Sequence, residues 1–313
     1  MKQLLGGLTF LIIFAWMTDG VQAQNNRKID SLFALYEVSE QDTLKIQLLS
    51  EISQELFSND PVKAQYYTTR IMQLSEYLGY RKGMALSHKN TGTINYYQGN
   101  FKEALESYSK SLEIQQEEGD QKGMASSYNN IGAIHASQGN YVKALENYFS
   151  SLEILESLNE QSMMAATYNN IGAVHQYQGN YDKAREYYSR ALEIKEDLGD
   201  VESVATIMNN LGVIFFEEGR LTEALEHYFE SLKTRVRIGD QRGMAVSYTN
   251  MGEIYAARGE YEQALVNHQQ ALKIQEEIGD KKGMTYALNG MAEIYTRLNK
   301  PRQAIEILQN SID

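Results

Sequence analysis

The chain contains no cysteine, only two prolines and a single tryptophan in 313 residues. The absence of cysteine excludes disulfides, thiolate metal ligands and a thiol for lipid attachment. Scarce proline together with many helix-forming residues favours an all-α fold. The chain also lacks an excess of basic residues. Its formal net charge of -12 argues against a nucleic-acid partner, which would need clustered Lys and Arg.

Residues 1–23 have the features of a signal peptide. Lys2 provides the positive start, Leu4–Met17 form a short apolar run, and small residues precede an expected cleavage after Ala23. No later stretch is apolar enough to cross a bilayer. We therefore expect a periplasmic or secreted protein with no membrane span after signal removal and, without a lipobox cysteine, no lipid anchor.

A repeat with a period of 40 residues dominates the rest of the chain. Four series of small residues recur in phase. Two glycine series are Gly92, Gly132, Gly172, Gly212, Gly252 and Gly99, Gly139, Gly179, Gly219, Gly259. The others are Gly79, Gly119, Gly199, Gly239, Gly279, with Asn159 standing in once, and Ala64, Ala104, Ala144, Ala184, Ala224, Ala264, Ala304. Seven units can be counted, beginning near residues 44, 84, 124, 164, 204, 244 and 284.

Each unit is predicted to contain two amphipathic helices. In the third unit, apolar residues spaced by three and four predict helices over 124–137 and 141–158. Between them, Gly139 suits a left-handed C-cap and Asn140 suits the N-cap of the second helix. Both prolines fall in phase with the first position of the second helix, where proline is tolerated. At the joint between units, Gly119 should end one helix and Asp120 should cap the next.

The small residues inside the helices indicate close packing. Gly132 costs about 1 kcal/mol relative to alanine in a helix interior, a cost expected where a neighbouring backbone comes close. Ala144 in the second helix is the expected counterpart. We assign this packing role to two in-phase series, Gly92, Gly132, Gly172, Gly212, Gly252 and Ala104, Ala144, Ala184, Ala224, Ala264.

These units resemble the tetratricopeptide repeat family. The pattern is carried by Tyr128, Ile131-Gly132, His135, Ala144 and Tyr148, and it recurs from Tyr168 and from Tyr248. The resemblance covers about residues 44–313, although the unit is longer than the usual 34 or so residues and lacks the closing proline. This variant is similar to the repeats of spindle-orientation adaptors, kinesin light chains and bacterial envelope sensors.

The resemblance implies an all-α, right-handed solenoid of about seven antiparallel helix pairs, whose first helices line a concave groove. Within residues 24–43, the stretch 28–37 looks like an extra helix that caps the N-terminal face. At the other end, Ile305, Leu308 and Ile312 in the last helix have no evident cover. This end could self-associate, dock on a partner, or continue into a further domain.

Catalytic and metal sites are not expected. The QGNYVK segment at 138–143 resembles a phosphate loop, but it lacks the preceding strand and the G-K-[ST] context. His135 and His175 are one period apart, but Phe215 and Tyr255 fill their position in later units, so a packing role is favoured over a metal site. We expect no enzyme activity, no cofactor and no metal.

The candidate binding residues are asparagines of the first helices. One series is Asn90, Asn130, Asn170, Asn210 and Asn250, and a second includes Asn129, Asn169 and Asn209. An amide both donates and accepts, as a peptide bond does. In the peptide-binding relatives that the repeat resembles, asparagines at this position clamp an extended peptide. The alternative is that they hydrogen-bond the neighbouring unit, and the two roles can coexist.

The predicted function is a non-catalytic scaffold that binds a protein or an extended peptide. Around the asparagines the groove carries aromatic residues (Tyr96, Tyr97, Tyr177 and Phe216), one base (Lys89) and two acids (Glu217 and Glu253). Such a mixed surface suits an extended peptide. The main alternative is the sensory input region of a two-component or transcriptional signalling system, and an enzyme with an unrecognised site is a weaker one.

Overall fold

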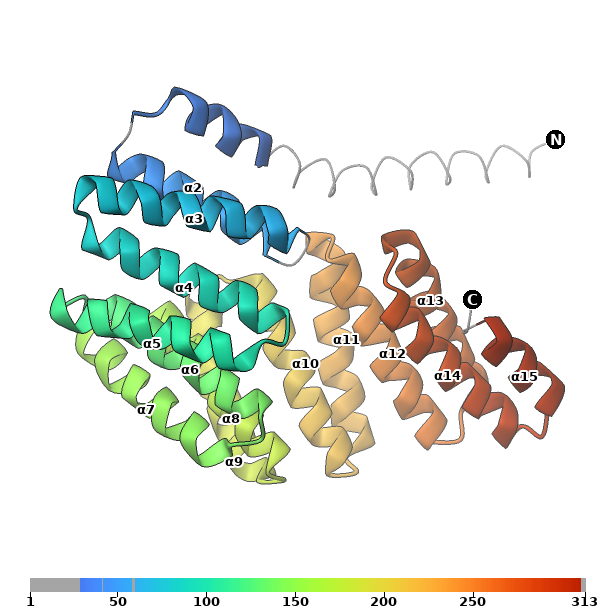
Figure 1. The fold of residues 1–313 in the computed structure, drawn as a ribbon. Helices are drawn as coiled ribbons and strands as arrows, with labels where there is room; N and C mark the ends of the chain where they lie inside the picture. The colour runs from blue at the N-terminus through green and yellow to red at the C-terminus, as the bar shows by residue number, and fades with distance from the viewer. Residues whose placement is uncertain (1–28, 41, 58–59, 311–313) are drawn as a thin grey trace. The chain divides into compact units, whose positions relative to one another are not determined.

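A computed structural model describes residues 29–40, 42–57 and 60–310, and these residues form helices joined by short connections (Figure 1). The predicted signal peptide, residues 1–23, lies outside the described residues. A helix at residues 29–38 comes first. It is followed by α2 (Thr43–Leu56), α3 (Pro61–Leu78), α4 (Arg81–Tyr97), α5 (Phe101–Glu117), α6 (Gln121–Ser137), α7 (Tyr141–Leu158), α8 (Gln161–Tyr177), α9 (Tyr181–Asp197), α10 (Val201–Glu217), α11 (Leu221–Ile238), α12 (Gln241–Ala257), α13 (Tyr261–Ile278), α14 (Lys281–Arg297) and α15 (Pro301–Asn310). The prediction of an all-α fold is confirmed.

The chain divides into two compact units, Met1–Thr167 and Tyr168–Asp313, and the boundary falls within α8. Within the first unit α2 packs on α3, α4 on α5 and α6 on α7, and each pair packs on the next. Within the second unit the pairs α10 with α11, α12 with α13 and α14 with α15 repeat this arrangement. In both units the even-numbered helices are the first helices of the repeats.

Glycine and proline mark the helix ends as predicted. Gly139 has a φ of 74° and Gly119 a φ of 64°, so both lie in the left-handed region that ends a helix. Asn159, which replaces glycine once, also adopts a positive φ of 52°. Pro61 and Pro301 occupy the first positions of α3 and α15. These positions need no backbone N–H, which explains why proline is accepted there.

The two kinds of helix start differ in their capping. Asp120 accepts a hydrogen bond from the backbone N–H of Gly123 at 3.0 Å, which confirms the predicted cap. Asn140 occupies the N-cap position of α7, as predicted, but its side chain makes no capping hydrogen bond. Its Nδ2 donates to Gln138 Oε1 at 3.4 Å, a contact that leaves its Oδ1 unused as a cap acceptor.

The in-phase glycine of the first helices packs against an aromatic ring, whose atoms, and not those of Ala144, lie nearest to a Cβ placed on Gly132. A Cβ placed on Gly132 would lie 2.7 Å from Cε1 and 2.8 Å from Cδ1 of Tyr148. The same relation joins Gly92 to Tyr108, Gly172 to Tyr188, Gly212 to Tyr228 and Gly252 to His268. The glycine therefore makes room for the flat face of a ring on the second helix of its own repeat.

The alanine of each second helix faces the following repeat. Ala104 is fully buried and lies in one cluster with Ile131 and Ile134 of the next first helix. A series that the sequence analysis did not single out, Ile94, Ile134, Val174, Ile214, Ile254 and Ile294, has exposed fractions of 2% or less. Small alanine and fully buried β-branched residues together close the joint between repeats.

The ends of the described chain differ in how much apolar surface they bury. Leu32 in the N-terminal helix is buried in a cluster with Leu48 and Ile52 of α2. In α15, by contrast, Ile305 is 56% exposed and Leu308 is 40% exposed; Ile312 lies outside the described residues. Among the described helices, none is both long and apolar enough to span a bilayer.

Candidate functional site

The asparagines of each first helix share one helix face with the residues three or four and seven positions after them. On α10 this face carries Asn209 and Asn210, then Val213, then Phe216 and Glu217, in steps that keep them on one side of a helix. We call the corresponding side of each first helix the ladder face.

The asparagines of successive repeats hydrogen-bond to one another in the second unit. Asn210 Nδ2 donates to Asn169 Oδ1 at 3.1 Å, and Asn250 Nδ2 donates to Asn209 Oδ1 at 3.0 Å. The second asparagine of one repeat thus pairs with the first asparagine of the repeat before it. These contacts support the alternative that the ladder ties neighbouring repeats together, with a side chain as the partner.

The ladder changes in the first unit. Asn90 is only 1% exposed and donates from Nδ2 to Ser50 Oγ at 3.0 Å, so it belongs to the interior. In the same repeat, Lys89 stands where later repeats have Asn129, Asn169 and Asn209. An ammonium group can only donate and offers no acceptor to the following asparagine, which is Asn130.

Asn130 is consequently the ladder amide with the most freedom to bind a ligand. Its side chain is half-buried and makes no hydrogen bond with the described residues. Burial lowers the pKa of the neighbouring Lys89, which makes no ion pair with any described residue. The predicted residues Asn129 and Asn170 are also half-buried. The first helices of the first unit therefore carry an ammonium group at Lys89 and an amide at Asn130 in successive repeats.

A pocket opens on the ladder face of the second unit. Its volume is about 390 Å³, and it is lined by α10, α12 and α14, with one contribution from α13. We call it the C-terminal pocket, and its lining includes Phe216, Glu253, His268, Tyr286, Asn289 and Glu293. Three consecutive first helices thus build one concave site.

Carboxylates dominate the electrostatics of the C-terminal pocket. Glu253 and Glu293 are one repeat apart, and Arg297 donates to Glu293 Oε1 at 2.7 Å. Glu253 keeps contact with solvent but has no hydrogen bond or ion pair with the described residues. Partial desolvation by the pocket walls raises its pKa, and the charges of Glu293 and Glu217 raise it further.

His268 forms part of the lining of this pocket and takes the place of the tyrosine in other repeats. The side chain is 1% exposed, and its Nδ1 has no hydrogen-bond partner within the described chain. Burial lowers the pKa of His268 to about 4, so the imidazole is neutral near pH 7. Gly252 and Gly290 flank the ring closely enough that a Cβ on either would meet it within 3.0 Å.

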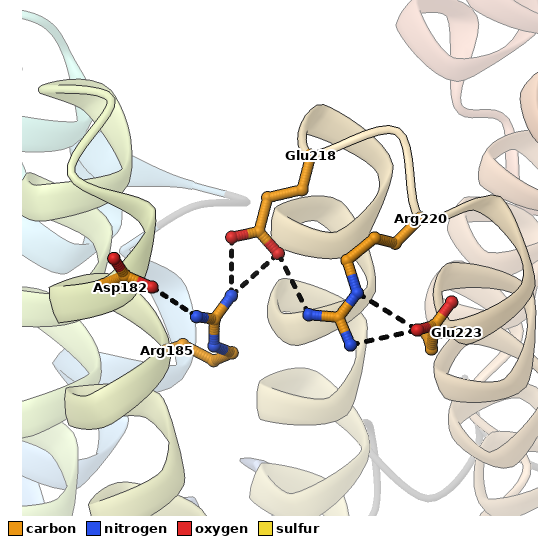
Figure 2. A network of polar contacts seen from close by, with 5 residues as sticks. All are labelled: Asp182, Arg185, Glu218, Arg220 and Glu223. Carbon is orange, nitrogen blue, oxygen red and sulfur yellow. Dashed lines mark hydrogen bonds and ion pairs between the residues drawn. The ribbon is translucent and has the colours of Figure 1, made fainter.

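A network of charged side chains joins α9 to the turn before α11 (Figure 2). Arg185 Nη1 contacts both oxygens of Glu218 at 2.6 and 2.7 Å, and the same carboxylate receives Arg220 Nη1 at 3.4 Å. Asp182 and Glu223 bind the outer sides of the two guanidinium groups. Other repeats have leucine in phase with Arg185, as at Leu145 and Leu225. The network therefore replaces an apolar contact between repeats and is best explained as structural.

The histidines considered for a metal site contact aromatic residues or lie at aromatic positions. His175 is buried and stacks on Tyr187 with ring centroids 5.6 Å apart, and burial lowers its pKa. Burial also lowers the pKa of His135. No group of three or more His, Cys, Asp or Glu side chains that could hold a metal ion occurs among the described residues.

The repeat pattern placed Phe216, Glu217 and Glu253 around the asparagines. It did not indicate that Phe216 and Glu253 line one pocket with His268, Tyr286 and Arg297. The available signal was a departure from the repeat. The last two complete repeats have glutamate, Glu253 and Glu293, at one repeat position. The same position in the earlier repeats is occupied by Thr93, Ala133, Ala173 and Val213. A pocket between three helices cannot be located from the period of a single helix.

Comparisons with known proteins agree with this architecture. Among solved structures, BtubC (BKLC) from P. vanneervenii is 22% identical, with 67% of this chain and 89% of that chain covered and a TM-score of 0.60. A signal transduction ATPase of the STAND class with a tetratricopeptide repeat sensor, from Pyrococcus horikoshii, is 18% identical over 91% of this chain and 46% of that chain (TM-score 0.69). A Rap protein complexed with competence and sporulation factor is 17% identical over 97% of this chain and 94% of that chain (TM-score 0.64).

At these identities the structures show a common fold, the helical solenoid that the repeat pattern predicted. No curated protein matches the chain. A family profile described as tetratricopeptide repeat matches residues 83–157, 163–235 and 243–313, which is well over half of the sequence. The chain therefore belongs to the tetratricopeptide repeat family.

Proposed function

We propose that the protein is a non-catalytic scaffold whose ladder face binds an extended segment of a partner protein. The observation that carries this proposal is the ladder face itself. It offers, at Asn130, an amide without a hydrogen-bond partner among the described residues and, in the second unit, a pocket of about 390 Å³. An amide can pair with the backbone of an extended chain whatever its side chains. The likeness to a Rap protein complexed with competence and sporulation factor over nearly the whole chain is consistent with this use of the fold.

The place of action that we propose is the periplasm or the exterior of the cell, because residues 1–23 have the pattern of a cleavable signal peptide. A second candidate function is sensory input for a signalling protein. The similarity to a STAND protein with a tetratricopeptide repeat sensor favours it, although the chain spans less than half of that protein. Both functions require the ladder face to bind a partner.

The test compares two asparagines that the structure separates. Random dodecapeptides displayed on phage are selected on the purified chain, and an enriched peptide is then titrated into Asn130→Ala and Asn250→Ala. Asn130→Ala should weaken binding about fivefold to tenfold with an unchanged melting temperature, because only a contact to the ligand is lost. Asn250→Ala should lower the melting temperature, because the buried Oδ1 of Asn209 loses its donor.

The matched control is Asn147→Ala on the second helix α7, since Asn147 is half-buried, as Asn130 is, and its Nδ2 donates to the carbonyl of Lys143 on the same helix. It should leave the affinity unchanged. Enriched peptides that bind Asn130→Ala as tightly as the parent chain would refute the role of Asn130. Failure to enrich any peptide would count against the whole proposal.

A further inference from the structure

The size and position of the C-terminal pocket suit a single long side chain. A volume of about 390 Å³ is near the lower end of ligand pockets, which span roughly 300–1,000 Å³. Its walls come from the ladder face of α12 and α14, the surface along which the proposed function lays an extended segment. Alternate side chains of an extended segment point towards the surface that binds it. One of them would enter this pocket.

The charge of the pocket selects the kind of side chain. Arg297 neutralises Glu293, whereas Glu253 has no hydrogen-bonding or ionic partner in the described chain. Glu217 adds to the negative potential around Glu253 and helps to raise its pKa. One uncompensated carboxylate therefore lines the pocket, where it stays exposed to solvent and can form a charge-assisted hydrogen bond with a cation.

A buried histidine also borders the pocket and adds no charge to it. His268 lines the pocket, is 1% exposed and has an Nδ1 without a hydrogen-bond partner among described atoms. Such a group is costly to leave unpaired. Because its pKa is about 4, the imidazole is neutral at pH 7 and adds no positive charge that would repel a cation.

Two aromatic rings complete the lining. Phe216 from α10 and Tyr286 from α14 both border the pocket. The negative face of an aromatic ring attracts ammonium and guanidinium groups, most strongly where water is partly excluded. Resting on the proposed function, we propose that the C-terminal pocket binds a lysine or arginine side chain of the segment that lies on the ladder face.

The experiment uses the full purified chain and a peptide selected from random dodecapeptides on phage. The selected sequences should share a lysine or arginine at one position. Affinity is then measured by isothermal titration calorimetry for the peptide with arginine at that position and for the same peptide with citrulline, its neutral isostere. Each peptide is titrated into the parent chain, Glu253→Gln and the control Glu277→Gln. The control changes the net charge by the same amount, and Glu277 is an exposed residue of α13 that does not line the pocket.

In the parent chain, citrulline should weaken binding about tenfold, as expected for loss of a charge-assisted hydrogen bond. Glu253→Gln should weaken the arginine peptide by a similar factor and remove the difference between the two peptides. Glu277→Gln should behave as the parent chain does. Circular dichroism melting checks that both variants fold, and Glu253→Gln removes a repelled carboxylate without changing its shape.

The outcomes separate this inference from the proposed function. Selected peptides that bind without a preferred cation, or that discriminate arginine from citrulline equally in Glu253→Gln, would overturn the assignment of the pocket and leave the scaffold function standing. If selection yields no peptide at all, both are overturned.

Discussion

The contact between Gly132 and Tyr148 can be tested by adding a single methyl group. In Gly132→Ala the new Cβ would lie 2.7 Å from a ring carbon of Tyr148, closer than carbon atoms pack. The ring is 2% exposed and has little space to move away. The variant gains about 1 kcal/mol of helix propensity but loses about 1–3 kcal/mol by overpacking. We expect a net loss of stability of up to about 2 kcal/mol.

The decisive measurement is a double-mutant cycle with Tyr148→Leu, which removes the ring. In that background Gly132→Ala should stabilise the protein by about 1 kcal/mol, because only the gain in helix propensity remains. Urea denaturation followed by circular dichroism gives the free energies. Hydrogen exchange in α6 and α7 checks that the effect is local, since repeat proteins can unfold in parts. An equal effect of Gly132→Ala in both backgrounds would refute the contact.

Two further predictions concern buried groups. Ala184→Leu, at a fully buried joint between repeats, should lower the free energy of unfolding by about 1–3 kcal/mol in urea denaturation, and unchanged stability would contradict the packing described here. His268 has a pKa of about 4 when folded, below an ordinary value of about 6.5. Its contribution to stability is therefore complete above pH 7 and is lost as the pH falls from 6.5 towards 4, with a loss of about 2 kcal/mol by pH 5. In His268→Phe, the free energy of unfolding should fall by about 2 kcal/mol less between pH 7.5 and pH 5 than it does in the parent chain. The same pH dependence in both proteins would show that His268 does not titrate in this way.

The fold could be predicted from the sequence because every repeat gives the same information again. A glycine with positive φ, an aspartate cap and an apolar stripe recur every 40 residues, so that an error in one copy is corrected by the others. The ring that lies nearest to Gly132 was not predicted, for a related reason. Ala144 and Tyr148 lie one turn apart on α7 and share the same period, so periodicity cannot tell which of them faces the glycine.

The candidate site was less predictable, since it depends on contacts between repeats. Asn130 and Asn210 have the same phase in the sequence, yet Asn210 pairs with Asn169 while Asn130 has Lys89 in place of an acceptor. The identity of a residue 41 positions away decides which amide is free. The C-terminal pocket likewise needs side chains from three helices at once, which no local pattern specifies.

Residues that depart from the repeat on the ladder face point to what distinguishes this protein from a generic array. At the phase of Glu253 the earlier repeats carry small or weakly polar residues, so the fold does not require a carboxylate there. Desolvation and two neighbouring carboxylates raise the pKa of Glu253. Lys89 is a parallel case, since its ammonium group is desolvated and leaves Asn130 without an acceptor. Both departures forgo stabilisation that the regular repeat would provide, and a bound partner with complementary groups would restore it. The departures, more than the repeated residues, are therefore expected to specify the partner.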